Sequence, residues 1–340
     1  MLKGLRVLAC CLALTAWSPP APANAPRGPT LAAVADRGAV RCGVDAAGRA
    51  GFAERDAEGR WRGFDIDYCR AVAAAVLGDG GGVDVVPLAP ADRLDALARG
   101  EIDLLAHGTA WTFSRDMATG IAFVAVTYFD GQGFMVPREP GIRSAFELDG
   151  ARVCVPAATT AERDLVAFFA ANSMELEVVR VADGAGLQAA YGGGACDAVT
   201  GDLSRLAAVR HWLADPEAHL ILPDVISKEP LALVVREDDP TWADVVRWTH
   251  FALLRAEELA LGADDVTSPE RRERPAVRAF VAGTRTAVLP EGWAVDVVHR
   301  VGHYGEIFAR HFGEASELGL DRGLNGLWID GGLHYPMPFR

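Results

Sequence analysis

The sequence predicts an α/β protein of two lobes, followed by a mainly helical C-terminal region. Strand-like and helix-like segments alternate along the chain, which is typical of mostly parallel sheets covered by helices. This rhythm occurs twice, on either side of a break at 137–141 that contains proline and glycine. The repetition indicates two α/β lobes, and helices are expected after them over 242–261 and 293–312.

The first lobe is predicted from hydrophobic periodicity and from the residues that end each segment. The helix that begins at Phe64 has apolar side chains at the i, i+4 spacing of a buried face, and the glycines after Asp79 end it. The expected elements are a helix over 30–38, a strand over 40–44, a loop over 45–62, a helix over 64–77, a strand over 83–88, a helix over 91–99 and a strand over 102–105.

The second lobe repeats this order of elements after the break. The expected elements are a strand over 151–155, a helix over 161–171, a strand over 175–181, a helix over 186–191 and a strand over 197–200. Thr159 and Thr160 stand directly before the first of these helices, where hydroxyls and backbone N–H groups form either an anion site or an ordinary helix cap. Asp202 follows the last strand, where capping of the next helix is one of its possible roles.

The first 25 residues have the order of a secretory signal peptide. Lys3 and Arg6 precede an apolar run over 7–17, and Ala23-Asn24-Ala25 matches an A-x-A cleavage site. The apolar run is far shorter than the ~20 residues that a membrane-spanning helix needs. We therefore expect export of the chain, removal of residues 1–25 and no stable membrane insertion.

The charge of the chain argues against two classes of partner. The 340 residues include 33 Lys and Arg against 46 Asp and Glu, which gives a formal charge of −13. Cleavage removes Lys3 and Arg6 and no acidic residue, so the mature charge is −15. Nucleic acids and anionic lipids are bound by basic surfaces, so we expect neither as a partner.

Four cysteines remain after cleavage, and an even number in an exported chain predicts disulfides. Four cysteines allow three pairings, of which we favour Cys42 with Cys69 and Cys154 with Cys196. Cys42 lies in an expected strand and Cys69 in the following helix, whereas Cys154 and Cys196 lie in two strand-like runs of the second lobe. Four buried free thiols are the alternative. Because no Cys-x-x-Cys is present in the sequence, we expect no metal site.

A series of short motifs resembles periplasmic solute-binding proteins (family 3) of polar amino-acid ABC transporters. The first is Gly63-Phe64-Asp65-Ile66-Asp67, and the segments 302–308 and 322–328 resemble the branch of general L-amino-acid-binding proteins. The motifs between them lie at 100–103, 111–116, 128–136, 148–150, 158–160, 196–202 and 226–231. No single motif is decisive, but the ordered series covers essentially the whole mature chain.

This resemblance implies a two-lobed clamshell, the type 2 periplasmic-binding-protein fold, with mixed, mostly parallel sheets and a helical C-terminal extension. The ligand of such a protein sits between lobes that close by hinge motion, and the chain crosses between the lobes twice, near 133–137 and 226–231. The expected division is a signal peptide at 1–25, lobe 1 at 26–135, lobe 2 at 136–229, a return to lobe 1 at 230–282 and the extension at 283–340. The implied partners are an L-amino acid or related zwitterion and the permease subunits of an ABC transporter, bound by a monomer without a cofactor.

The resemblance also assigns candidate ligand-binding residues. A zwitterionic ligand needs one partner for its carboxylate and another for its ammonium. Arg115 matches the family's carboxylate-binding arginine, with an exposed arginine at a helix start as the alternative, and Asp202 matches the ammonium-binding aspartate. The other candidates are Thr159 and Thr160 at the expected anion site, Thr109, Ala110 and Trp111 where the family lines the cleft, and Phe52 as an apolar wall. For Trp111 and Phe52 a core position is an equally good interpretation.

Two departures from the family pattern change the expected pocket. Where the family usually has Arg-Asn-Thr-Thr before Trp111, this chain has His107-Gly108-Thr109-Ala110, so a hydroxyl that commonly contacts the ligand is missing at Ala110. Arg49 stands where an apolar or aromatic residue is expected. We hypothesise that Arg49 or His107 contacts the ligand and favours an acidic or polar side chain.

Two other functions are compatible with the predicted fold. A periplasmic lyase or dehydratase on the same clamshell would use His107 as a general base and Arg115 to hold a substrate carboxylate. A ligand-sensing partner of a membrane receptor would use the same cleft as a transport protein. We expect a binding protein and not an enzyme, because the ordered motifs are those of binding proteins and no serine nucleophile motif is present in the sequence.

Overall fold

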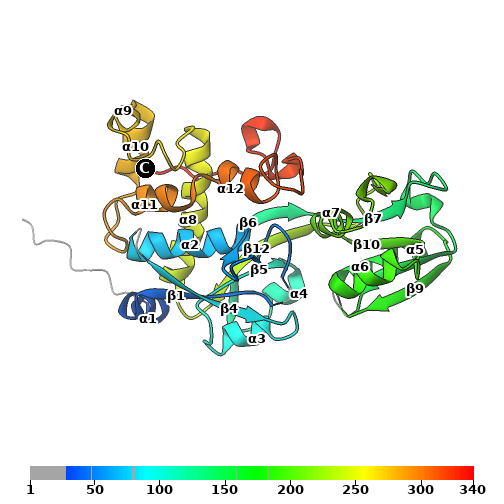
Figure 1. Cartoon of the computed structure of the whole chain (residues 1–340). Helices are drawn as coiled ribbons and strands as arrows, with labels where there is room; N and C mark the ends of the chain where they lie inside the picture. The colour runs from blue at the N-terminus through cyan, green and yellow to red at the C-terminus, as the bar shows by residue number, and fades with distance from the viewer. Residues whose placement is uncertain (1–27, 47, 79–80, 158, 183) are drawn as a thin grey trace, which may run out of the picture.

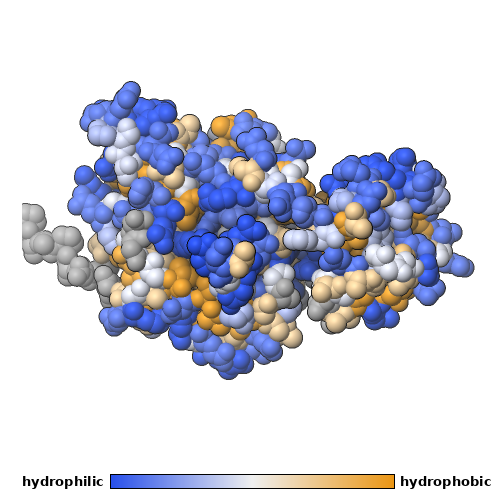
Figure 2. All heavy atoms as spheres, viewed as in Figure 1, coloured by the Kyte–Doolittle hydropathy of each residue, from blue (hydrophilic) through white to orange (hydrophobic). Residues whose placement is uncertain are grey.

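A computed structural model describes residues 28–340 apart from 47, 79–80, 158 and 183. The expected signal peptide at 1–25 lies outside the described residues. Figure 1 shows two lobes of unequal size, with the C-terminal helices on the larger one. Hydrophilic residues cover most of the face seen in Figure 2. Within the described part, no helix is both long enough and apolar enough to cross a membrane.

The larger lobe is built on a five-stranded sheet in the order β4-β1-β5-β12-β6. β1 is parallel to β4 and β5, whereas β12 is antiparallel to both β5 and β6. The strands are β1 (Ala39–Asp45), β4 (Gly82–Leu88), β5 (Leu104–Ala110), β6 (Ile121–Asp130) and β12 (Glu229–Arg236). β6 is therefore one edge of this sheet.

The smaller lobe is built on a second five-stranded sheet in the order β11-β7-β10-β8-β9. β8 is parallel to β9 and β10, and β7 is antiparallel to β10 and β11. The strands are β7 (Gln132–Pro137), β8 (Ala151–Pro156), β9 (Leu176–Val181), β10 (Ala198–Asp202) and β11 (His219–Ile221). The two mixed sheets and their helices confirm the predicted two-lobed α/β fold.

The chain changes sheet between Asp130 and Gln132, and it returns to the first sheet at Glu229. Gly133, Phe134 and Met135 pair with β10, so they belong to the second sheet, although the sequence division places them at the end of lobe 1. A buried apolar strand next to a hinge has the same pattern whichever sheet it joins, so periodicity does not show the lobe to which it belongs. The rest of the division into lobes stays a proposal.

Helices cover both sheets (Figure 1). In the larger lobe and its extension they are α1 (Pro29–Arg37), α2 (Phe64–Leu77), α3 (Arg93–Ala98), α4 (Phe113–Asp116), α8 (Pro240–Glu258), α9 (Pro269–Arg272), α10 (Pro275–Gly283), α11 (Trp293–Val301) and α12 (Tyr304–His311). In the smaller lobe they are α5 (Thr160–Ala171), α6 (Gly184–Gly192) and α7 (Leu203–His211). The short strands β2 (Glu54–Arg55) and β3 (Trp61–Arg62) form a hairpin in the expected loop. α2 is buried along most of its length, between the sheet and the helices α8 and α11.

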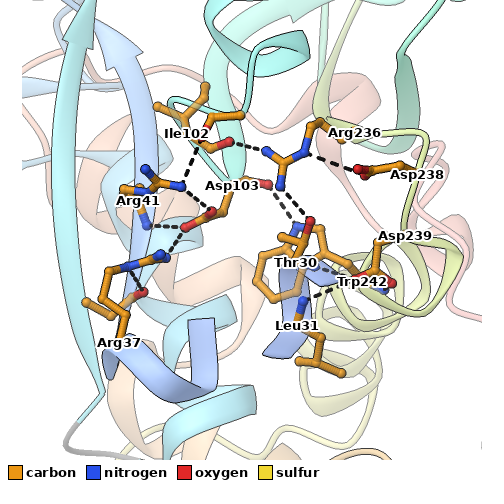
Figure 3. A network of polar contacts seen from close by, with 12 residues as sticks. Thr30, Leu31, Arg37, Arg41, Ile102, Asp103, Arg236, Asp238, Asp239 and Trp242 are labelled. Atoms are coloured by element: carbon orange, nitrogen blue, oxygen red, sulfur yellow. Dashed lines mark hydrogen bonds and ion pairs between the residues drawn. The ribbon is translucent and has the colours of Figure 1, made fainter. Parts of the chain in front are cut away.

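A polar network joins the N-terminal helix to the core of the larger lobe (Figure 3). Asp239 Oδ2 accepts hydrogen bonds from the backbone N–H groups of Thr30 (2.9 Å) and Leu31 (3.1 Å) at the start of α1. Its Oδ1 caps α8 by accepting from the backbone N–H of Trp242 (2.9 Å). The Trp242 indole donates to the C=O of Asp103 beside β5 (2.8 Å). One buried carboxylate thus fixes α1 and α8 to the same sheet.

The helix expected over 293–312 is two helices, α11 and α12. Gly302 has φ +83°, which ends α11. His303 then starts α12 with a capping box, in which its side chain accepts from the Glu306 N–H and the Glu306 side chain accepts from the His303 N–H. The helical pattern predicted the secondary structure correctly, but the glycine and the cap divide it.

Both expected disulfides are present. Cys42 of β1 is bonded to Cys69 of α2, and Cys154 of β8 is bonded to Cys196, just before β10. Each lobe therefore has one disulfide, in the favoured pairing. Each bridge joins a strand of the sheet to a segment that follows it in the chain.

Candidate functional site

The candidate site lies where the chain crosses between the sheets. The carboxyl ends of parallel strands meet at one edge of a sheet, and ligands of α/β proteins bind there. In the larger lobe this edge includes the end of β5 and the short helix α4, and in the smaller lobe it includes the end of β10 and the start of α5. The loop after β1 brings Arg49 to the same region.

Arg115 lies on α4, directly after β5, and is half-buried. Its Nη1 donates to the C=O of Ala110 (2.9 Å), which holds the guanidinium against the end of the strand. Burial lowers the pKa of Arg115, and Arg163 of α5 also lowers it, whereas Glu229 and Asp202 act in the opposite direction. Arg115 is therefore within electrostatic reach of charged groups of the smaller lobe.

Asp202 ends β10 and stands at the N-cap of α7, but its side chain makes no capping hydrogen bond. Its Oδ2 instead accepts from Nη2 of Arg49 at 2.8 Å. The Asp202 carboxylate therefore does not cap α7, and the alternative of simple helix capping is excluded. Asp202 is a partner for a cation at the lobe crossing.

Arg49 is only 5% exposed and joins the larger lobe to the smaller one. Besides Asp202, its Nη2 donates to Ser204 Oγ (2.7 Å) and lies 3.4 Å from Asp130 Oδ2. Its guanidinium stands 4.1 Å from the ring centre of Phe52, a cation–π contact. Burial disfavours its charge, but the surrounding carboxylates outweigh burial and raise the pKa of Arg49.

Gly108 makes room for Arg49. Its φ is +56°, and a Cβ at this position would lie 2.6 Å from Arg49 Nη1. Two departures from the family pattern, at positions 49 and 108, therefore belong to one arrangement. The sequence shows them as separate changes because they lie in different segments.

Asp130 and Glu229 stand at the two crossings and add carboxyl groups that were absent from the predicted site. Burial and the nearby Asp202 raise the pKa of Asp130 to about 6 and the pKa of Glu229 to about 7. Ser204 Oγ donates to Asp130, and Ser227 Oγ donates to Glu229 (3.1 Å). Both acidic residues lie inside the motifs at 128–136 and 226–231 that resemble the family. This position is the feature of the sequence by which they could have been found.

Thr159 and Thr160 open α5 as expected, in the smaller lobe. Thr159 Oγ1 accepts from the Glu162 N–H (3.3 Å) and donates to the C=O of Pro156 (2.7 Å), so its hydroxyl caps the helix. Thr160 is the first residue of the helix and is half-buried. An anion-binding role for these two residues remains a prediction.

Three of the predicted cleft residues lie in the interior. Phe52 is 2% exposed and packs against three aromatic rings beneath Arg49. His107 is 4% exposed, and its Nε2 lies 3.0 Å from the C=O of Leu88, while burial and the charge of Arg93 lower the pKa of its imidazole. Thr109 is fully buried, and its hydroxyl has no partner among the described residues.

Ala110 and Trp111 lie at the end of β5, next to Arg115. Ala110 is 5% exposed and supplies the C=O that holds Arg115. Trp111 is half-buried and stacks on Phe123, with ring centres 5.4 Å apart. Contact of either residue with a ligand remains a prediction.

The same region contains more arginines than the sequence suggested. Burial and the neighbouring Arg115 lower the pKa of Arg93 to about 10, and burial and Arg49 lower the pKa of Arg205. Arg163 likewise lowers the pKa of Arg115. Positive charges from both lobes therefore repel one another at the crossing, and an anion placed among them would relieve this repulsion.

Comparison with known proteins identifies relatives that match this chain over most of its length. The family of bacterial extracellular solute-binding proteins, family 3, matches residues 40–263. The general L-amino acid-binding periplasmic protein AapJ of Rhizobium johnstonii is 43% identical over 324 residues, which cover 94% of this chain and 95% of AapJ. The glutamate/glutamine/aspartate/asparagine-binding protein BztA of Rhodobacter capsulatus is 44% identical over 94% of this chain and 95% of its own.

A solved structure with the same fold extends this likeness. The periplasmic binding protein of an ABC transporter from Brucella ovis, solved with glutathione bound, has a TM-score of 0.86 and 45% sequence identity. The alignment covers 92% of this chain and 99% of the Brucella chain. The likeness thus includes the C-terminal extension as well as the two lobes.

Proposed function

Because this chain belongs to family 3 of the bacterial extracellular solute-binding proteins, we propose that it captures an amino acid between its lobes and delivers it to the permease subunits of an ABC importer. The observation that carries this proposal is that Arg115 and Asp202 stand on the two sides of the lobe crossing, close enough for Asp202 to act on the charge of Arg115. They come from different lobes: Arg115 lies on α4 of the larger lobe and Asp202 at the end of β10 of the smaller one. A monomeric binding protein, exported to the periplasm by its signal peptide, is the form in which we expect this function.

The two residues supply the two partners that a zwitterion needs. The guanidinium of Arg115 has five N–H donors, so one bond to Ala110 is compatible with a two-bond contact to a carboxylate. Arg49 binds Oδ2 of Asp202, and a ligand ammonium would approach the other oxygen. Removal of both ligand charges from water is costly unless each meets such a partner.

We further propose that the preferred ligand has a second negative group. Five arginines surround the crossing, and several of them lower the pKa values of their neighbours. They are Arg49, Arg93, Arg115, Arg163 and Arg205. A ligand with one carboxylate leaves much of this repulsion in place, whereas a side-chain carboxylate reduces it. Arg49 already meets the carboxylates of Asp202 and Asp130, so the preference rests mainly on the other four arginines. The buried His107 contributes little as a ligand contact. BztA is named for glutamate and aspartate together with their amides glutamine and asparagine, and the Brucella protein was solved with glutathione bound.

A thermal-shift screen of the mature protein tests both statements. The ligands are the twenty amino acids, glutathione and glutarate, each at one concentration. A ligand at a hundredfold excess over its Kd stabilises the folded protein by about 2.7 kcal/mol. We expect L-glutamate and L-aspartate to raise the melting temperature more than L-leucine does. Tight binding of leucine without binding of either acidic amino acid would contradict the proposed preference.

Arg115→Ala should abolish the shift, because the carboxylate then loses its charged partner. The matched control is Arg143→Ala, since Arg143 also donates to a backbone C=O, that of Ile142 at 3.2 Å, but on the exposed surface of the smaller lobe. The control should keep the full shift. A shift that survives in Arg115→Ala would remove Arg115 from the binding site, and with it the main support for the proposal.

A further inference from the structure

The C-terminal extension covers the outer edge of β6. β6 is an edge strand, so some of its backbone N–H and C=O groups face away from β12. At Phe129 both groups bond to the side chain of Asn325. The Phe129 N–H donates to Oδ1 (2.7 Å), and the Phe129 C=O accepts from Nδ2 (3.0 Å). The amide of Asn325, which is 4% exposed, thus pairs with the strand as a neighbouring peptide group would.

Arg322 holds Asn325 on the larger lobe. Its Nε and Nη2 donate to the C=O of Asn325 (3.0 and 2.8 Å). Its Nη1 and Nη2 also reach the carboxylate of Glu257 on α8 (3.0 and 3.3 Å). The guanidinium lies 5.1 Å from the ring centre of Tyr304 and 5.2 Å from that of Phe308, within cation–π range. The turn that carries Asn325 is therefore anchored to α8 and α12.

A second contact lies two residues earlier on β6. The Tyr304 hydroxyl donates to the C=O of Thr127 (3.0 Å), and it is also bonded to Nε2 of His334 (3.0 Å). Thr127 has no partner residue in β12, because the register of the two strands shifts between Leu231 and Ala232, and its C=O is bonded to Tyr304 instead. The extension thus contacts both Thr127 and Phe129.

These contacts end where the chain leaves the larger lobe. Phe129 is followed by Asp130 and Gly131, and β7 of the second sheet begins at Gln132. Toward the interior of the sheet, Phe129 is paired in β12 with Pro230, and Pro230 lies at the second crossing. Both backbone groups of Phe129 are used by Asn325, and Pro230 has no N–H to offer it. The extension therefore holds the backbone of β6 directly before the first crossing.

We propose that Asn325 is a positioning residue of the hinge. It fixes Phe129 to the larger lobe, so that the rotation of the smaller lobe starts at Asp130 and follows one defined direction. This inference rests on the proposed function, because a defined closure matters for a ligand held between the lobes. The extension, which lies beyond the segment 40–263 matched by the family, acquires a role in ligand capture.

The test compares wild type, Asn325→Ala and Asn325→Asp in the mature full-length chain. Spin labels on the two lobes report the distance between them, amide hydrogen exchange reports Phe129, and calorimetry with L-glutamate reports affinity. Asn325→Ala should broaden the interlobe distance distribution, speed exchange of the Phe129 amide at least tenfold and weaken L-glutamate binding about tenfold, since both hydrogen bonds are lost. Asn325→Asp keeps the acceptor for the Phe129 N–H, so its amide should stay protected while the distances broaden to an intermediate extent.

Asn172→Ala is the matched control. The Asn172 side chain also donates to a backbone C=O, that of Phe168 at 2.8 Å, but in the smaller lobe and away from the crossings. It should leave all three measurements unchanged. An Asn325→Ala protein with the wild-type melting temperature, distance distribution and affinity would overturn the proposal. If the alanine variant does not fold, the same measurements on Asn325→Asp decide whether the proposal holds. If wild type does not bind L-glutamate, the proposed ligand preference fails, while the interlobe distances still decide the role of Asn325.

Discussion

At the scale of single residues, Arg49 determines how the charges at the crossing are arranged. It is buried, it contacts acceptors from the hinge and from the smaller lobe, and it occupies one oxygen of Asp202. Its position depends on Gly108, which lies in another segment of the chain. The charge at position 49 and the absent side chain at position 108 are thus two parts of one structural feature.

Gly108→Ala should lower the free energy of unfolding and weaken ligand binding. An alanine at positive φ costs roughly 1–2 kcal/mol, and its Cβ would also lie 2.6 Å from the held guanidinium of Arg49. Gly319→Ala is the matched control, because Gly319 has a similar φ of +54° with nothing within 4 Å of a Cβ. Urea unfolding of both variants gives the comparison. Equal costs at the two positions would show that Arg49 is not restricted by Gly108.

Glu229→Gln should stabilise the protein more at pH 8 than at pH 5. The pKa of Glu229 is raised to about 7, mainly by burial, so the folded state binds this proton more tightly than the unfolded state does. Ionisation of Glu229 therefore destabilises the fold fully above pH 7, and this cost disappears as the pH falls toward the unfolded value. Glutamine resembles the protonated form at every pH. We expect the benefit of the substitution to differ by about 1–2 kcal/mol between the two pH values.

Denaturant unfolding at pH 5, 6, 7 and 8 measures this difference against wild type. Glu217→Gln provides the control, since Glu217 lies in a surface turn of the smaller lobe and its carboxylate is 87% exposed. The control should show the same small effect at each pH. A benefit of Glu229→Gln that does not change with pH would mean that Glu229 is already ionised at pH 5 in the folded protein.

At the scale of elements, the strands and helices near the crossing are held by contacts with distant segments. The disulfide between Cys42 and Cys69 joins β1 to α2, which forms much of the core of the larger lobe. α12 and the turn at 322–325 cover the edge of β6. The end of β5 supplies the C=O that positions Arg115. The site therefore depends on how these elements pack.

The double variant Cys42→Ala, Cys69→Ala should lower the free energy of unfolding by about 3 kcal/mol. The bridge closes a loop of 27 residues, and its removal restores conformational freedom to the unfolded chain. Chemical unfolding of both proteins under oxidising conditions measures the loss. A reductant also breaks the bridge between Cys154 and Cys196, so wild type and variant should have similar midpoints when both are reduced and differ only under oxidising conditions. An unchanged midpoint in the variant would show that α2 and β1 hold together by packing alone.

At the scale of the whole molecule, the two sheets share the crossing, and the charged groups of the site stand beside it. Arg115 comes from the larger lobe and Asp202 from the smaller one, while Asp130 and Glu229 stand at the ends of β6 and β12 where the chain crosses. Rotation of one lobe against the other would therefore move the two proposed ligand partners relative to each other. This arrangement explains how closure and ligand binding can be coupled in one chain.

The sequence by itself determined the alternation of strands and helices, the pairing of the cysteines that we favoured and the family resemblance. These depend on periodicity, on glycines and caps, and on short motifs, all of which are local along the chain. The family resemblance also identified Arg115 and Asp202 as candidates, because they match the carboxylate-binding arginine and the ammonium-binding aspartate of the family. The sequence missed the roles of Asp130 and Glu229, and it divided the lobes a few residues too late at 135.

Only the tertiary structure decided which side chains meet. Arg49 reaches Asp202 from a loop more than a hundred residues earlier, Asn325 reaches Phe129 from the C-terminal extension, and Phe52 and His107 turn into the interior. Such contacts depend on which sheet a strand joins and on which face a side chain takes after packing. Local periodicity contains neither kind of information, because burial and charge pairing are properties of the assembled lobes.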